Sequence, residues 1–433
     1  MVIRIIKKSQ LYFIFSFALL IVLGALLLKT PWVMNSRVAL DWSDALFTAT
    51  SAVCVTGLTV VPTSEFNLGG QLIILLLIQL GGLGIMTLSA TILLALGRNM
   101  SLGSTLIYST LNESVPRRTE ELLRTITYYT LVIEAVGSVV LIIGFLLSGQ
   151  PFFQALYLGI FHAISAFCNA GFSPFDDSLT GVSSYIKIAV AALIIAGGLG
   201  MYVIYDLVHF RRQSRVLSIN TRLILTATVI LIIGGSIGIK FSENFASVEP
   251  ISWLDAFFQA VSARTAGFNS VDLSALSQSS ITLLIILMLI GAAPGSTAGG
   301  MKLTGVSLAA ISIVNTFFGN QKVLLFKREI PISNVLKSYT IICTYILLTL
   351  IGALTLAGCC GDVMIASFFE AASAVGTVGL TVGTTEKLTL AGKLTVIALM
   401  FIGRIGPFTM FLFLLGREKK SALTYPEERV VIG

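Results

Sequence analysis

Long apolar runs follow one another along the whole chain and are separated by short polar connections. A helix of about 20 apolar residues crosses the ~30 Å hydrocarbon core of a bilayer. Runs of about this length or more occupy residues 11–28, 68–96, 125–147, 185–210, 223–241, 281–318, 335–357 and 390–415. The pattern therefore predicts an all-α integral membrane protein with eight membrane-spanning helices.

A shorter apolar segment that ends near a glycine lies between the two spans of each pair. The four segments are residues 44–59 (DALFTATSAVCVTGLT), 155–173 (ALYLGIFHAISAFCNAGFS), 253–269 (WLDAFFQAVSARTAGFN) and 366–381 (ASFFEAASAVGTVGLT). Each has a Phe ten residues before the glycine and a Leu or Phe directly after it; the Phe residues are Phe47, Phe161, Phe257 and Phe369. This shared register predicts a unit of span, short re-entrant helix, non-helical glycine segment and span, used four times.

The unit divides the chain into consecutive repeats with the same plan. We expect the first repeat at residues 1–97, the second at 98–211, the third at 212–319 and the fourth at 320–416, followed by a cytoplasmic tail at 417–433. The four Phe residues are expected to pack the short helices together. Four equivalent units in one chain predict a pseudo-fourfold arrangement around one central pore.

The glycine segments are the candidate ion-binding site. They contain Val55, Thr56 and Gly57; Asn169, Ala170 and Gly171; Thr265, Ala266 and Gly267; and Thr377, Val378 and Gly379. Non-helical backbone within a membrane survives only where it is buried in protein or lines a watery cavity. Glycine permits positive φ, and a ring of carbonyl oxygens can replace the water shell of a monovalent cation. The alternative is that these glycines only allow helices to pack closely.

Composition excludes a soluble domain. Of the 433 residues, 55% are hydrophobic and 11% charged, with a mean hydropathy of +0.93, whereas soluble domains carry about 25% charged residues. The five cysteines show no metal-ligand spacing, so we expect free thiols, with the adjacent pair Cys359 and Cys360 left open. Because the sequence has no catalytic constellation, no dinucleotide-binding glycine motif and no Walker A motif, we expect neither an enzyme nor nucleotide binding by this chain.

The charges predict an orientation. If both termini and the connections between repeats share one side, that side holds 19 of the 28 Lys and Arg residues. By the positive-inside rule this side is cytoplasmic. The basic groups are also candidates for docking an acidic partner or anionic membrane lipids. Most acidic residues, among them Asp176, Asp177 and Glu386, then lie outside, where they would raise the local cation concentration.

A glycine-rich interruption breaks the long apolar run of the third repeat. Residues 291–302 read GAAPGSTAGGMK, and a continuous helix is not expected there. The candidate gate consists of Gly291, Ala292, Ala293, Pro294, Gly295, Ser296, Thr297, Ala298, Gly299, Gly300 and Lys302, together with Arg404. The alternative is a kinked helix with a hinge.

Arg404 stands within the last apolar run, where a guanidinium is costly unless it faces a cavity or a partner. A fixed positive charge below the glycine segments would oppose the passage of cations. The alternative is a structural ion pair with a membrane carboxylate such as Glu134 or Asp206.

Four further polar side chains lie on or beside the short helices. We expect His162 to pack or to make a hydrogen bond, and Asp255 and Glu370 to hold the glycine segments or to face the outer mouth. Arg264 directly precedes Thr265 and is expected to brace its segment through a carboxylate.

Together these motifs resemble the Trk/Ktr/HKT superfamily of potassium uptake proteins and are closest to the bacterial Ktr membrane subunit. The resemblance covers essentially the whole chain and rests on Val55–Leu58, Asn169–Phe172, Thr265–Phe268 and Thr377–Leu380. It implies that the glycine segments bind potassium as the transported ion and that residues 291–302 and Arg404 form an intramembrane gate. In plant relatives a Ser in place of the first glycine goes with sodium preference, so Gly57 favours potassium.

The resemblance also implies an assembly. Ktr membrane subunits form homodimers in the plasma membrane of bacteria and dock a cytosolic ring of nucleotide-binding (RCK-type) regulatory subunits. ATP or ADP is therefore expected only on that partner, and no nucleic acid is expected. An ion-coupled secondary transporter, driven by sodium or protons, or a sodium-preferring relative, remains the alternative.

Overall fold

The computed structural model describes residues 2–36, 38–84, 119–210, 217–246, 251–320, 322–361 and 363–406. Several predicted features lie outside these ranges. They are the polar connection around Arg98, Arg117 and Arg118, the basic group Arg211, Arg212 and Arg215, the tail at 417–433, and the last residues of the runs 68–96 and 390–415.

Four sets of helices follow the predicted order of leading helix, short helix and return helix. The leading helices are α1 (Val2–Leu28), α6 (Thr119–Leu147), α10 (Ile219–Ala246) and α14 (Ile332–Cys360). The short helices are α2 (Trp42–Val53), α7 (Phe152–Phe167), α11 (Trp253–Ser262) and α15 (Met364–Gly376). The return helices are α3 (Leu68–Leu83), α8 (Ser184–Gly198) with α9 (Met201–His209), α12 (Gln278–Leu289) with α13 (Leu303–Phe317), and α16 (Leu390–Ile405).

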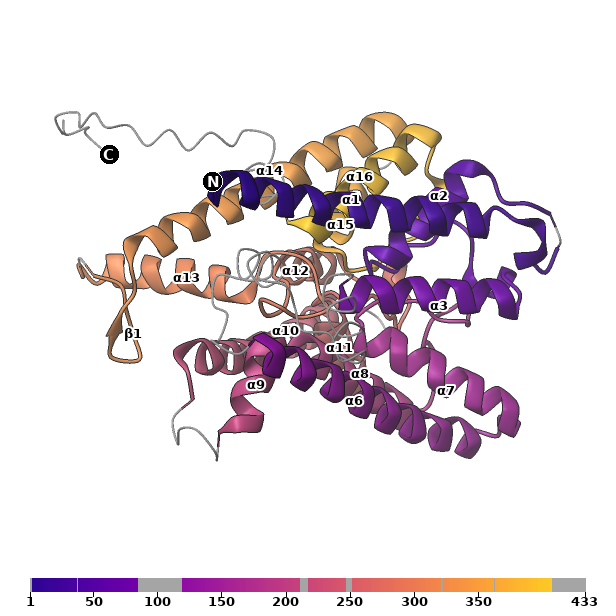
Figure 1. Ribbon diagram of the computed structural model, residues 1–433, viewed down its shortest axis with the longest axis horizontal. Helices are drawn as coiled ribbons and strands as arrows, with labels where there is room; N and C mark the ends of the chain where they lie inside the picture. The colour runs from indigo at the N-terminus through magenta and orange to yellow at the C-terminus, as the bar shows by residue number, and fades with distance from the viewer. Residues whose placement is uncertain are drawn as a thin grey trace.

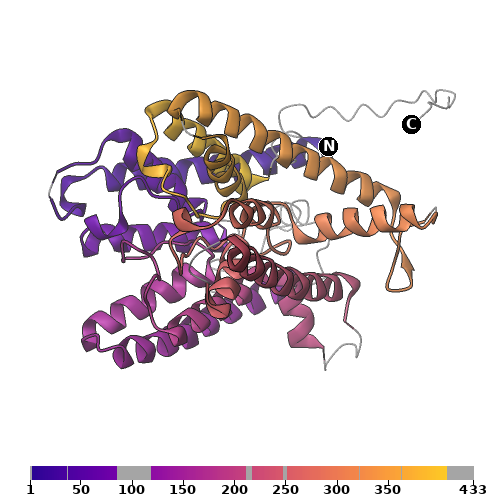
Figure 2. The same cartoon turned by 180° about the vertical axis from the view of Figure 1, so that it is seen from behind.

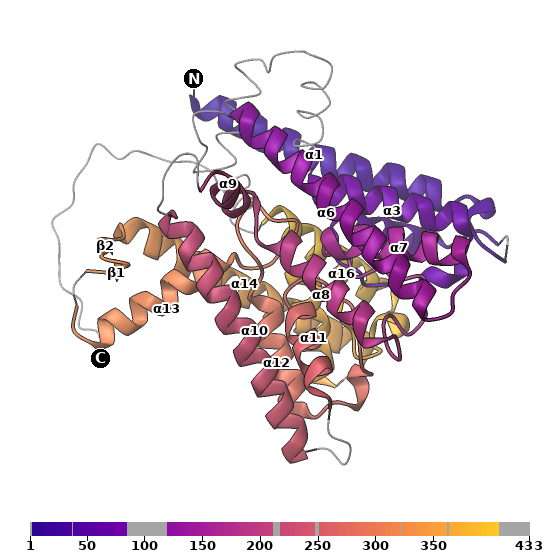
Figure 3. The ribbon, with the colours of Figure 1, turned by 90° about the horizontal axis from the view of Figure 1, so that it is seen from below.

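The four sets are arranged in a ring. The return helix of each set contacts the short helix of the next, in the pairs α3 with α7, α8 with α11, α12 with α15, and α16 with α2. Figure 1 shows the first set between the fourth, above it, and the second, below it, while Figures 2 and 3 show the third set on the far side. The last helix of the chain thus packs beside the first short helix and closes the ring.

Local sequence explains where the return helices begin. Asn67, Ser277 and Thr389 cap α3, α12 and α16, because each side chain accepts a hydrogen bond from a backbone N–H in the first turn. Such a cap satisfies one of the N–H groups that a helix leaves unpaired at its start.

The ends of the return helices correct one expectation. The run 185–210 is not one straight helix, because α8 and α9 are bent by 92° at Leu199 and Gly200. Gly200 has a φ of +81°, which a helix interior does not allow. Gly84, after α3, and Gly406, after α16, have φ values of +75° and +90°. In the third set the interruption at residues 291–302 is confirmed, since α12 ends at Leu289 and α13 starts at Leu303.

The helices are those of a membrane protein. Among the described residues, α6, α10 and α14 are each long and apolar enough to cross a bilayer alone, and α8 with α9 qualifies as a bent pair. Apolar helices of 10–17 residues include α3, α7, α12, α13 and α15. All five cysteines are free, as expected for Cys54, Cys168 and Cys343, and the pair Cys359 and Cys360, which the sequence left open, is free as well.

A small hairpin that the sequence pattern did not reveal follows α13. Its strands, β1 (Leu324–Leu325) and β2 (Arg328–Glu329), pair antiparallel around Phe326 and Lys327, and both turn residues have positive φ. The hairpin projects beyond the helices at the same end as the start of α1 (Figure 1).

Candidate functional site

The four glycine segments converge on one axis, and each glycine touches the next segment. A Cβ atom built on Gly57 would lie 2.4 Å from the carbonyl oxygen of Ala170, and a Cβ atom on Gly171 would lie 2.6 Å from the carbonyl oxygen of Ala266. A Cβ atom on Gly267 would lie 2.3 Å from the carbonyl oxygen of Val378, and a Cβ atom on Gly379 would lie 2.1 Å from the carbonyl oxygen of Thr56. The contacts run from repeat one to two, three, four and back to one. We call Gly57, Gly171, Gly267 and Gly379 the glycine ring; no side chain fits at any of its positions.

The backbone of each segment alternates between two conformations. The residue two before each glycine has positive φ: Val55 (56°), Asn169 (58°), Thr265 (74°) and Thr377 (50°). Each ring glycine also has positive φ, between 71° and 96°. Alternation of left-handed with ordinary conformations turns successive carbonyl groups toward the same side of the chain. Left-handed φ is an outlier for the β-branched Val and Thr, and such strain gathers at functional sites.

A serine on every short helix braces the glycine segment, a feature that was not predicted from the sequence. The hydroxyls of Ser51 and Ser373 accept the N–H of Gly57 and Gly379, each at 3.0 Å. Ser165 and Ser262 instead donate to the carbonyls of Phe172 and Phe268, at 2.8 and 2.6 Å. The signal was present, because a Ser stands five or six residues before every ring glycine.

Three threonine hydroxyls of the glycine segments have no hydrogen-bond partner within the described chain. They belong to Thr56, Thr265 and Thr377, and all three residues are fully buried. Buried polar atoms are normally paired, so an unpaired one requires an explanation. Hydroxyl oxygens left free beside a ring of carbonyl groups are suited to contact a cation.

The third repeat is out of register by one residue. Phe47, Phe161 and Phe369 are fully buried, whereas Phe257 is partly exposed and its neighbour Phe258 is fully buried. Counting back from the glycine, which singled out Phe257, therefore selects the wrong Phe. The bracing serines confirm the offset. Ser262 precedes its glycine by five residues, whereas the serines of the other three repeats precede their glycines by six.

The polar side chains around the segments are placed as follows. His162 is buried, lies 2.8 Å from the carbonyl of Leu158 and 3.0 Å from the hydroxyl of Ser173, and so makes the expected hydrogen bonds. Glu370 is also buried and accepts hydrogen bonds from Thr381 and Thr385, which follow the fourth glycine segment. The Glu370 carboxylate therefore ties the short helix α15 to the chain beyond the ring.

Residues 291–302 lie directly beneath the ring. A Cβ atom built on Gly299 would lie 2.1 Å from the Thr377 hydroxyl of the fourth segment. The two ends of the loop are held together by hydrogen bonds from Gly291 N to Met301 O (2.9 Å) and from Leu303 N to Ala292 O (3.0 Å). The loop is thus a closed, non-helical excursion between α12 and α13, rather than a kink in one helix.

The loop also contacts the second and fourth repeats. Ala293 N donates to Gly198 O at 3.1 Å, and Met201 N donates to Gly295 O at 3.1 Å, at the break between α8 and α9. On the other side, the Tyr345 hydroxyl of α14 donates to Gly300 O at 3.0 Å. The loop therefore crosses the space under the ring from the second repeat to the fourth.

Arg404 joins the loop to the first repeat. Its guanidinium donates to the carbonyl oxygens of Thr297, in the loop, and of Gly81 and Gly82, near the end of α3. The carboxylate partners considered as an alternative are engaged elsewhere, Glu134 with Gln79 and Asp206 with Thr221. Arg404 is thus bound to backbone carbonyl groups of two repeats.

Two other cations lie close to this region. Lys302 donates to the carbonyl of Ala298 at 2.8 Å, within its own loop. Arg264 is buried, and its Nε has no hydrogen-bond partner among the described residues. The expected carboxylate brace for Arg264 is therefore not found in the described structure.

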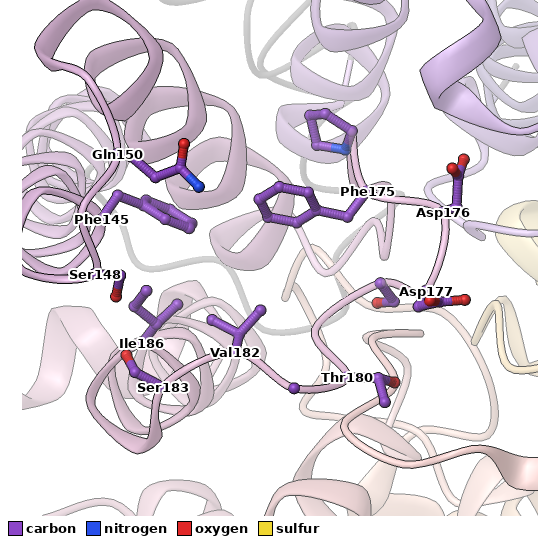
Figure 4. Close-up of a pocket in the computed structure, with 13 residues that line it drawn as sticks. Phe145, Ser148, Gln150, Phe175, Asp176, Asp177, Thr180, Val182, Ser183 and Ile186 are labelled. Carbon is purple, nitrogen blue, oxygen red and sulfur yellow. The ribbon is translucent and has the colours of Figure 1, made fainter.

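A cavity of about 710 Å³ opens beside the chain that follows the second glycine segment. Phe145 and Gln150 line one side, and Phe175, Asp177 and Thr180 line the other (Figure 4). Asp176 lies at the edge of the cavity and accepts a hydrogen bond from Ser64 of the first repeat. The cavity is thus separate from the glycine ring.

Comparison with known proteins shows the family of the chain. Residues 13–419 match the TrkH family model, described as cation transport protein. The chain belongs to this family. It is 36% identical over 427 residues to Ktr system potassium uptake protein B of Bacillus subtilis, covering 96% of this chain and 95% of the relative. It is also 36% identical to potassium/sodium uptake protein NtpJ of Enterococcus hirae, with the same two coverages.

A solved structure shares the fold of this family member. The potassium transporter TrkH from Vibrio parahaemolyticus superposes with a TM-score of 0.72 over 94% of this chain and 85% of that chain, at 20% sequence identity. The similarity supports a helical membrane-protein fold of the TrkH type.

Proposed function

We propose that this membrane protein takes up potassium through a channel-like pore whose narrowest part is the glycine ring. One observation carries the proposal: the four glycine segments close into a ring in which each glycine touches the carbonyl group before the next. The relatives named for potassium uptake supply the ion.

The ring would select the ion with backbone oxygens. Carbonyl groups that face the axis replace the hydration shell of a potassium ion, and the free hydroxyls of Thr56, Thr265 and Thr377 add oxygen ligands at the segments. The N–H bonds to Ser51 and Ser373 hold two of the segments from behind. Potassium is the substrate in this proposal, and the chain needs no cofactor of its own.

The loop at 291–302 and Arg404 would form the gate. The loop lies under the ring, and the Arg404 guanidinium links it to α3. In this arrangement a positive charge stands next to the ion path and opposes a passing cation until the loop moves. Opening therefore requires the hydrogen bonds between Arg404 and the carbonyl groups to break or to rearrange.

The proposal includes the repeat plan and the assembly. The boundaries 1–97, 98–211, 212–319 and 320–416 would enclose eight spans and four re-entrant helices, with both termini in the cytoplasm of a bacterium. A homodimer bound to an RCK-type ring that carries ATP or ADP fits the relatives named as parts of Ktr systems.

Sodium-coupled or sodium-preferring transport is the second candidate. The Enterococcus hirae relative is named for both potassium and sodium. Coupled transport, however, uses one site near the middle of the membrane, whereas the described chain brings four equivalent segments to one ring.

Uptake of ⁸⁶Rb⁺ and ²²Na⁺ by purified protein in liposomes tests the proposed function. We expect Rb⁺ uptake to follow an interior-negative potential and to exceed Na⁺ uptake. Equal uptake of the two ions would contradict a potassium-selective ring, and Rb⁺ uptake that requires a sodium or proton gradient would favour the coupled transporter.

A further inference from the structure

Two ion pairs occupy equivalent places on opposite sides of the ring. Between the second and third repeats, Lys187 Nζ donates to Asp255 Oδ1 at 2.7 Å. Between the fourth and first repeats, Lys393 pairs in the same way with Asp44. Both lysines are the fourth residue of a return helix, and both aspartates are the third residue of a short helix.

A second contact is repeated at the same two short helices. The Nζ atom of Lys29, directly after α1, lies 5.5 Å from the ring centroid of Trp42 and donates to the carbonyl of Leu40. Lys240 of α10 lies 5.9 Å from the ring centroid of Trp253 and donates to the carbonyl of Ile251 at 2.5 Å. The starts of α2 and α11 are therefore each held by two lysines, one in or directly after the leading helix of the same repeat and one from the return helix of the repeat before.

The other two junctions lack the pair. The fourth residue of α3 is Gln71, which accepts a hydrogen bond from the Tyr157 hydroxyl of α7. The fourth residue of α12 is Ile281, which is apolar. Charged junctions thus alternate with uncharged ones, so the outer rim of the pseudo-fourfold ring has twofold symmetry.

The pair at the third repeat is held by further contacts with its surroundings. Lys187 is buried and also lies 3.4 Å from the carbonyl of Ser270, three residues after Gly267. Burial raises the pKa of Asp255, but the hydrogen bonds from Lys187 and Ser252 outweigh burial, so the pKa lies below the ordinary value of a carboxyl. An Asp in the first turn also complements the positive end of the helix. A paired carboxylate of this kind positions α11 and is not free to bind a passing cation.

We propose that Lys187–Asp255 and Lys393–Asp44 are positioning pairs that fix α11 and α2 and, through these helices, hold Gly267 and Gly57 across the ring from each other. The inference rests on the proposed function, because its readout is ion selectivity. It assigns to these pairs a role that differs from attracting cations to the outer mouth. The pairs thus act on the diagonal between Gly57 and Gly267, and in the described part of the chain the starts of α7 and α15 lack an equivalent pair.

A double-mutant cycle on the buried pair tests this role. Lys187→Gln, Asp255→Asn and the double variant are compared with the unchanged protein by the ratio of ⁸⁶Rb⁺ to ²²Na⁺ uptake in liposomes. We expect each single variant to lower the ratio by about fivefold, the factor that corresponds to an ion pair worth about 1 kcal/mol. The double variant should lower the ratio no further than the single variants, because the pair is broken only once.

The sign of the two single effects separates positioning from attraction. If these charges acted only by their field, removal of the lysine would raise uptake of both cations and removal of the aspartate would lower it, with the ratio unchanged. That result, or additive effects in the double variant, would overturn the proposal. Lys387→Gln removes an exposed positive charge at the same face and is expected to leave the ratio unchanged.

The second pair makes the test independent of one variant's folding. The same cycle with Lys393→Gln and Asp44→Asn is expected to give the same pattern, and Lys393→Arg should preserve the ratio. Selective uptake in the unchanged protein with no change in any variant would contradict the positioning role alone. Equal uptake of Rb⁺ and Na⁺ by the unchanged protein would instead contradict the proposed function.

Discussion

Gly57 occupies a position that only glycine fits. Its φ is +94°, and a Cβ atom there would lie 2.4 Å from the carbonyl oxygen of Ala170 in the next repeat. Backbone atoms cannot move aside as a flexible side chain does, so any larger residue displaces one segment of the ring relative to its neighbour.

We therefore expect Gly57→Ser to lower the Rb⁺ to Na⁺ uptake ratio by about tenfold, since backbone strain of this kind costs on the order of 1–3 kcal/mol. Uptake by liposomes measures the ratio. Gly234→Ser is the matched control, because a Cβ atom at Gly234 meets no other atom within 4 Å. An unchanged ratio in Gly57→Ser would argue against selection by carbonyl groups at this ring.

The serine braces make a separate prediction. Ser373→Ala removes the hydroxyl that accepts the N–H of Gly379, and a buried donor left without a partner costs about 1–3 kcal/mol. We expect both a lower free energy of unfolding, measured by thermal denaturation in detergent, and a lower Rb⁺ to Na⁺ ratio. Ser138→Ala removes a hydroxyl that bonds the carbonyl of Glu134 within its own helix, and it should leave the ratio unchanged. If both variants lowered the ratio equally, Ser373 would have no special role at the ring.

At single residues the sequence predicted the glycines but not their surroundings. Four glycines in register are visible because the chemistry allows no other residue. The bracing serines were overlooked because Ser is common in short polar-apolar stretches and carries no signal alone. Phe257 was chosen over Phe258 because counting assumes equal spacing, and in the third repeat the buried Phe precedes the glycine by nine residues rather than ten.

Among the elements, the loop at 291–302 has the clearest consequence for function. It is linked to α3 by Arg404 and to the second repeat by Thr297, whose hydroxyl donates to Phe167 O at 3.2 Å and Gly197 O at 3.3 Å. Arg404 and Thr297 are thus two side-chain anchors of the loop, beside the hydroxyl of Tyr345, and each of the two can be removed alone.

We expect Arg404→Ala to raise basal Rb⁺ flux several-fold, because it removes both a positive charge beside the ion path and the link to α3. Thr297→Val should also raise the flux, but less, since it loosens only the second anchor. Arg222→Ala, at an exposed arginine near the start of α10, serves as the control for loss of a positive charge. A flux that stayed at the basal level in both loop variants would remove this loop from the gate.

Only one of the two broken return helices could be predicted from the sequence pattern. The break in the third return helix could be predicted, because four glycines and a proline interrupt one apolar run. The 92° bend between α8 and α9 could not, because the glycines of the second repeat are flanked directly by apolar residues and no proline or polar residue accompanies them. The bend depends on tertiary contacts, since the Met201 N–H at the break bonds to Gly295 of the loop.

For the whole molecule, the order of the repeats around the ring could not be predicted. The repeats are similar enough to suggest fourfold symmetry, but the closure of α16 against α2 and the alternation of ion pairs depend on residues of different repeats that meet only in the fold. The charge distribution did predict the orientation of the chain in the membrane, and this orientation can be tested directly.

Labelling of single cysteines checks the orientation. In a variant without native cysteines, Glu386→Cys is expected to react with a membrane-impermeant maleimide added to intact cells, because this position is exposed and the charge distribution predicts that it lies outside. Lys327→Cys, in the turn of the hairpin, should react only after the cells are opened. The reverse pattern would place the termini outside and contradict the positive-inside assignment.

Rb⁺ bound on the axis of the glycine ring would test the central claim most directly. Crystals of the protein grown in rubidium chloride give anomalous scattering that locates the ion. We predict a peak on the axis surrounded by Gly57, Gly171, Gly267 and Gly379, and a weaker peak when sodium is in excess. A rubidium peak elsewhere in the membrane region, with none at the ring, would contradict the account.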